Sequence, residues 1–122
     1  MEKGGEIMVE YNEKYGEYTL EKDGVIVCWE EEPDEAQIKE AEALIEDYNR
    51  NIGHIAEAIM EEFKDFYEIE NVQQVIDNLK RPKIDPDMGQ VVYCEHTFDN
   101  EHIISFEYGE DFSDIDYIAL DG

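Results

Sequence analysis

The sequence has few positive charges: 9 Lys and Arg stand against 34 Asp and Glu in 122 residues, a formal net charge of −25. Affinity for phosphate groups comes largely from Lys and Arg that release counterions, so this shortage disfavours direct binding of nucleic acid or of an anionic membrane surface. Such composition can indicate disorder. Here 42% hydrophobic and 11% aromatic residues supply apolar surface for a core. We therefore expect one acidic folded domain over residues 1–122, with residues 1–6 frayed.

The sequence also lacks a long hydrophobic run. No stretch approaches the roughly 20 apolar residues of a membrane span, and residues 1–6 have no apolar segment behind a basic one. Secretion and membrane insertion are not expected, and a cytoplasmic location is predicted. Cysteine is scarce too, because Cys28 and Cys94 are the two in the chain. A disulfide could join them only if their strands were neighbours, and we expect two reduced thiols in the core.

Apolar patterns divide the chain into strands, helices and strands. Strand-like segments occupy residues 7–11, 15–21 and 25–29, and Asp23-Gly24 between the last two accepts the positive φ of a hairpin turn. Asp34 and Gln37 then have the spacing of a capping box, which predicts a helix from there to about Asn51. Further apolar residues at helical spacing predict a second helix to about Tyr67.

The last third returns to strands after a short helix that Asn71 could cap. Pro82 and Pro86 exclude helix across residues 80–88. Strands are then predicted at residues 90–98, 102–108 and 115–120, with a hairpin turn at 99–101 between the first two. Because the helices are grouped between the strands, the pattern predicts an α+β fold with helices packed on one face of a mostly antiparallel sheet.

Motifs for catalysis are missing from this sequence. It has no phosphate-binding glycine loop, and its serines lie in no nucleophile motif. Cys94 and His96 stand two residues apart on an expected strand, so a thiol and an imidazole could share one face. A buried thiol beside a structural histidine is the favoured interpretation. Because 34 acids make some close carboxylate pair inevitable, such pairs indicate little, and we expect no enzyme and no cofactor.

Metal sites are weakly indicated. His96 and His102 flank the turn at residues 99–101 and could approach each other with a carboxylate nearby, but histidines beside a turn are more typical of hydrogen-bonded groups. Asp111, Asp114 and Asp116 lack the spacing and the terminal Glu of a calcium loop. We therefore expect a solvated loop and no bound metal.

Charge is the main functional signal. A domain at −25 repels itself, and the usual compensations are solubility, salt adaptation or steering toward a basic partner. The densest acidic run follows an apolar strand and adjoins an aromatic residue, a combination suited to a cationic groove; alternatively, these acids only begin a helix. We predict a partner-binding edge formed by Trp29, Glu30, Glu31, Glu32, Asp34 and Glu35. The second candidate surface is the loop containing Glu110, Asp111, Asp114 and Asp116.

The C-terminal third carries a family resemblance, in Val91-Val92-Tyr93, in residues 101–106 and in residues 115–122. With the preceding helices, this pattern resembles small acidic bacterial domains of unknown function, some of them associated with polymorphic-toxin loci as immunity-like proteins. The usual glycine after the histidine is Ile103 in this chain. The resemblance implies an intracellular binding protein and brings no catalytic residue with it.

Two functions are compatible with this acidic α+β pattern. The first is an immunity protein that neutralises a nuclease-type toxin. The second is a phage-encoded inhibitor of a host defence nuclease, of the anti-CRISPR or anti-restriction type, in which carboxylates imitate the phosphates of a duplex. In both, the predicted partner is a basic protein, bound by occupying its substrate groove.

Overall fold

The computed structural model describes residues 9–121 and confirms the predicted α+β class. Residues 1–6, expected to be frayed, and Ile7 and Met8 of the first expected strand lie outside the described residues. The helices are α1 (Glu35–Arg50), α2 (Ile52–Phe63) and α3 (Val72–Leu79). The strands are β1 (Val9–Asn12), β2 (Glu17–Lys22), β3 (Val25–Trp29), β4 (Lys83–Asp85), β5 (Gln90–Tyr93), β6 (Ile103–Tyr108) and β7 (Ile115–Asp121).

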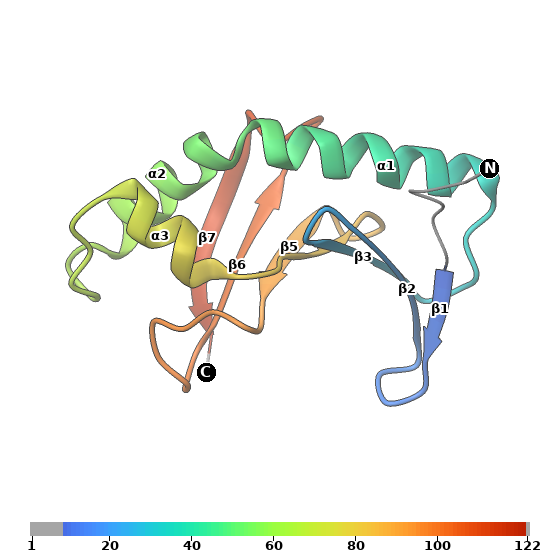
Figure 1. The fold of residues 1–122 in the computed structure, drawn as a ribbon, viewed down its shortest axis with the longest axis horizontal. Coiled ribbons are helices and arrows are strands. Elements are labelled where there is room, and N and C mark those ends of the chain that lie inside the picture. The colour runs from blue at the N-terminus through green and yellow to red at the C-terminus, as the bar shows by residue number, and fades with distance from the viewer. Residues whose placement is uncertain (1–8, 122) are drawn as a thin grey trace.

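The strands form one seven-stranded sheet in the order of the chain, β1 to β7. Neighbouring strands are antiparallel except β3 and β4, which pair in parallel. All three helices lie in the connection between β3 and β4 (Figure 1). This is the long crossover that a parallel pair requires.

The core lies between the helices and one face of the sheet. One row of residues in register crosses five strands, and each is at most 1% exposed: Leu20, Val27, Ile84, Val91 and Phe106. Ile45 of α1 and Ile55 and Ile59 of α2 belong to the same buried cluster. Figure 1 shows α1 and α2 crossing the same side of the sheet.

The helix caps and the hairpin turn that were predicted from short sequence patterns are present in the structure. The Asp34 side chain accepts from the Gln37 backbone N–H at 2.8 Å, and the Gln37 side chain accepts from the Asp34 N–H at 2.9 Å, which completes the capping box of α1. Asn71 caps α3 by accepting from the Gln74 N–H. Asp23 and Gly24 have φ values of 51° and 78°, the left-handed pair of a type I′ hairpin.

Two element boundaries differ from the prediction by more than two residues. Helix α2 ends at Phe63, not near Tyr67, and a turn follows in which the Phe66 and Tyr67 N–H groups both donate to the Phe63 carbonyl. Strand β5 ends at Tyr93, not at residue 98, because the chain turns toward α3: the Thr97 N–H donates to the Asn78 carbonyl at 2.8 Å. The three-residue strand β4, between Pro82 and Pro86, was not predicted as a strand.

Candidate protein-binding groove

A groove of about 800 Å³ runs along α1, between this helix, the β6–β7 loop and the β4–β5 turn. Its charged lining contains six carboxylates and two cations, an excess of four negative charges. The lining residues are Lys22, Glu40, Glu42, Ala43, Leu44, Glu46, Asp47, Arg50, Pro86, Tyr108, Glu110 and Asp111. Two of the predicted binding residues, Glu110 and Asp111, therefore lie at this groove.

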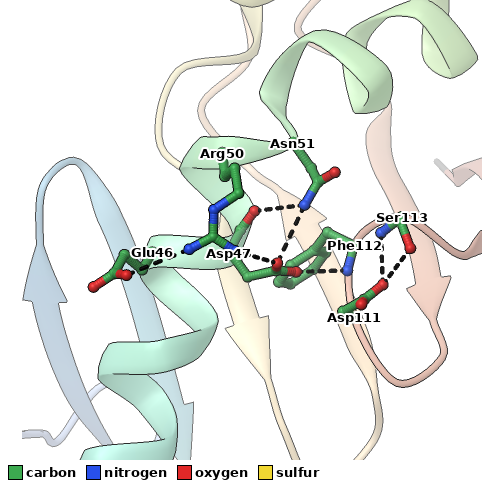
Figure 2. Close-up of polar contacts among 7 residues, drawn as sticks. All are labelled: Glu46, Asp47, Arg50, Asn51, Asp111, Phe112 and Ser113. Carbon is green, nitrogen blue, oxygen red and sulfur yellow. Dashed lines mark hydrogen bonds and ion pairs between the residues drawn. The ribbon is translucent and has the colours of Figure 1, made fainter.

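Asp47 joins the two walls of the groove (Figure 2). Its Oδ2 atom accepts from the Phe112 backbone N–H at 2.8 Å, across the gap between α1 and the β6–β7 loop. Its Oδ1 atom accepts from Arg50 Nη1 at 3.2 Å and from Asn51 Nδ2 at 3.3 Å. One partly buried carboxylate thus holds the loop against the last turn of α1.

An aromatic side chain of the loop anchors it in the core. Phe112 is fully buried and packs edge-on against Tyr48, with ring centroids 5.4 Å apart. It also packs against Tyr108 in a tilted arrangement, with ring centroids 4.5 Å apart. Asp111 Oδ1 accepts from the N–H and the hydroxyl of Ser113. These bonds to Ser113 lower the pKa of the Asp111 carboxyl, so that Asp111 keeps its charge to more acidic pH than an ordinary Asp.

The carboxylates of α1 were not among the predicted site residues. Glu40 and Glu46 are exposed, and Glu42 and Asp47 are half-buried. Spacings of four and seven residues place Glu42 with Glu46, and Glu40 with Asp47, on shared stripes of a helix. That spacing is visible in the sequence and could have identified an acidic helix face, although not the loop that lies opposite it.

The other predicted surface lies at the far end of α1. The acids Glu30, Glu31, Glu32, Asp34 and Glu35 are all exposed. Their segment joins β3 to the start of α1, whereas the groove's loop lies beside its last turn (Figure 1). A 16-residue helix is about 24 Å long, so the two predicted surfaces are separated by roughly that length.

The expectation of an exposed aromatic anchor at Trp29 is wrong. Trp29 is 3% exposed and belongs to the core cluster, on the helix-covered side with Val27. It therefore offers no ring to a partner.

Asp114 and Asp116 do not line the groove. Asp114 lies against Gly109, where an added Cβ would come within 2.5 Å of Asp114 Oδ2. Asp116 pairs in register with Glu107 of β6. Both aspartates are exposed, at the start of β7 beyond the groove.

The two histidines are held by hydrogen bonds. The Phe98 N–H donates to His96 Nδ1 at 3.3 Å, so His96 carries its proton on Nε2 and donates it to the His102 carbonyl at 2.6 Å. His102 Nδ1 donates to Asp99 Oδ2 at 2.8 Å. Within residues 9–121 no three His, Cys, Asp or Glu side chains gather as a metal site. Because β5 ends at Tyr93, strand alternation does not pair Cys94 with His96.

The two cysteines are free thiols in different surroundings. Cys28 on β3 is buried, and its burial, followed by the charge of Glu17, raises its pKa to about 12. Cys94, which follows β5, is exposed, so the expectation of a second core thiol is wrong. Strand β4 separates β3 from β5, and two strand spacings are about 10 Å, beyond the reach of a disulfide.

Comparisons with protein-family models, curated proteins and solved structures find no significant match to this chain. No helix within residues 9–121 is long and apolar enough to cross a membrane.

Proposed function

We propose that this chain is a non-catalytic inhibitor that neutralises a basic protein, in the first instance as an immunity protein against a nuclease-type toxin in the cytoplasm. The observation that carries the proposal is the excess of carboxylates around a groove whose two walls are joined by the bond between Asp47 and Phe112. Nucleases present cationic substrate sites, and a pre-ordered acidic surface binds such a site with little loss of conformational entropy.

The groove has features that suit a protein partner. Its carboxylates are fixed on a helix and on an anchored loop, while Leu44 and Tyr108 add apolar contact area between them. Lys22 and Arg50 lie near Glu42 and Glu46 in exposed ion pairs, at 3.8 and 3.4 Å. Exposed pairs of this kind contribute little to stability, so these acids can exchange their partners at small cost.

A second candidate function is a phage-encoded DNA mimic that inhibits a defence nuclease. The spacing along α1 favours it. The five acids of this helix span 12 residue steps, about 18 Å of helix axis: Glu35, Glu40, Glu42, Glu46 and Asp47. That is one carboxylate per roughly 4.5 Å, near the 3.4 Å per phosphate of one DNA strand.

Inhibition assays on a panel of purified toxin nucleases and defence nucleases test both functions and tell them apart. Two triple charge reversals then locate the site. One changes Glu40, Glu46 and Glu110 to Lys in the groove. The matched control makes the same change in charge at Glu30, Glu31 and Glu32, which are also exposed and lie at the other end of α1.

We expect the groove variant to lose inhibition by at least tenfold and the control variant to retain it. The reverse result would move the site to the edge at Glu30 to Glu35. If the unaltered protein inhibits no nuclease in the panel, the proposed function is wrong.

A further inference from the structure

An aromatic cluster lies at the end of α2, with one ring in solvent. Phe66 is 58% exposed. Its ring meets Tyr67 at 4.9 Å and His102 at 5.6 Å between centroids, both nearly at right angles. Phe66 is absent from the buried core and from the partly buried residues packed on it. Phe66 therefore presents a large apolar ring to solvent and does not contribute to the hydrophobic core of residues 9–121.

The rings behind Phe66 are fixed by a single carboxylate. Asp99 Oδ2 accepts from the Tyr67 hydroxyl at 2.6 Å and from His102 Nδ1 at 2.8 Å. Asp99 Oδ1 accepts from the backbone N–H groups of Glu101 and His102. Tyr67 also stacks on Phe98 at 5.0 Å. Because Tyr67 and His102 are already held in place, a ligand that binds on Phe66 would not have to order them, which lowers the entropic cost of binding.

Apart from Lys64, the charged residues next in sequence to the cluster are acidic. Asp65, Glu68 and Glu101 are exposed, and no cation of residues 9–121 forms an ion pair with them. The nearest cation in sequence, Lys64, pairs with Glu61 at 3.1 Å. An aromatic face beside unpaired carboxylates attracts a cation, and a planar guanidinium can stack on the ring while it donates to carboxylates.

We propose that Phe66, backed by Tyr67 and His102, is a docking site for an arginine side chain of a protein partner. This inference goes beyond the proposed function, because the site shares no residue with the groove. The partner is defined by chemistry: a segment with exposed arginine, preferred over lysine because only the guanidinium stacks.

Hexa-arginine and hexa-lysine peptides at physiological salt test the site, with binding followed by NMR on the labelled protein. Attraction to the charge of −25 acts on both peptides, and arginine also binds carboxylates bidentately, so stacking is measured by the part of the affinity ratio that depends on Phe66. We expect hexa-arginine to bind the Phe66 region about two- to fivefold more tightly. The ring signals of Phe66 and His102 should shift further with it than with hexa-lysine.

Two variants make the test specific. Phe66→Leu keeps apolar area but removes the aromatic face, and it should abolish the preference for arginine. Tyr117→Leu is the matched control, since Tyr117 is 72% exposed beside Asp116 but makes none of the ring contacts that support Phe66; this variant should keep the preference.

Equal affinities, no binding of either peptide, a preference that survives Phe66→Leu, or an equal loss in Tyr117→Leu would each overturn the inference. None of these outcomes depends on nuclease inhibition, so the site and the proposed function can fail separately.

Discussion

The hydroxyl oxygens of Tyr48 and Tyr93 lie 2.5 Å apart in the interior of the protein. Tyr48 belongs to α1 and Tyr93 to β5, and their side chains are 2% and 0% exposed. This hydrogen bond joins the helix layer to the middle of the sheet. Because both groups are out of reach of water, each hydroxyl depends on the other for a partner.

Removal of one of these hydroxyls should therefore lower the free energy of unfolding more than removal of both. Tyr48→Phe leaves the Tyr93 hydroxyl buried without a partner, for which we expect a loss of about 1–3 kcal/mol in the free energy of unfolding. The double Phe variant removes the unsatisfied group and should recover part of that loss. Urea unfolding of both single variants and the double variant measures the coupling. Strict additivity of the two losses would contradict the shared bond.

Three tyrosines with raised pKa values should make the protein less stable in alkali. Burial raises the pKa of Tyr48 and of Tyr93, and burial with the charges of Asp85 and Asp87 raises the pKa of Tyr108 to about 12. Above about pH 10 the unfolded chain loses these protons while the folded chain keeps them. The free energy of unfolding should fall as the pH rises from about 10 toward 12. Tyr108→Phe should flatten this slope, whereas an unchanged slope would show that Tyr108 does not contribute.

The two thiols should differ in reactivity. The thiolate is the reactive form, and Cys28 is buried with a pKa of about 12, whereas Cys94 is exposed. A maleimide at pH 7.5 should label one thiol in the folded protein and two in urea. Cys94→Ser should abolish labelling of the folded protein, and Cys28→Ser should not. Rapid labelling of both native thiols would be inconsistent with this structure.

Lys80 follows α3 in a backbone conformation that suits glycine. Its φ is 62° and its ψ is −147°, a region that residues with a side chain rarely occupy. We expect Lys80→Gly to stabilise the protein by about 1 kcal/mol. Lys80→Ala, which removes the same charge but keeps a Cβ, should bring no such gain. Thermal unfolding distinguishes the two variants, and equal stability in both would argue against strain at this residue.

Association with a nuclease partner should depend on salt. With a net charge of −25, long-range attraction accelerates encounter, and salt screens it over about 10 Å at 0.1 M. Between low and physiological salt the association rate should fall steeply, while the dissociation rate changes less. Surface plasmon resonance with an inhibited nuclease measures both rates. An association rate that does not change with salt would show that long-range attraction does not accelerate the encounter.

The sequence predicted those parts of the fold that depend on neighbours in the chain. The Asp34 and Gln37 capping box, the Asn71 cap and the turn at Asp23 and Gly24 are all contacts within a few residues. The end of β5 was misplaced because the bond between Thr97 and Asn78 comes from tertiary structure and overrides the strand pattern.

The groove could be predicted only in part, for the same reason. Glu110 and Asp111 were identified from their charge, but their opposite wall depends on the bond between Asp47 and Phe112, which are 65 residues apart. Trp29 was misassigned because it adjoins the acidic run in sequence, although it ends the continuous apolar run of β3 and is buried with that run.

The parallel pairing of β3 with β4 also has a consequence for how the chain folds. The other strand pairs join segments that are close in sequence, so β1 to β3 and β4 to β7 can each form as an antiparallel meander by local contacts. Joining the meanders requires closure of a loop that contains all three helices. Pairing of β3 with a strand of only three residues offsets little of that entropic cost, so the packing of the helices on both meanders has to offset the rest. We therefore expect this junction to form late in folding and to set its rate.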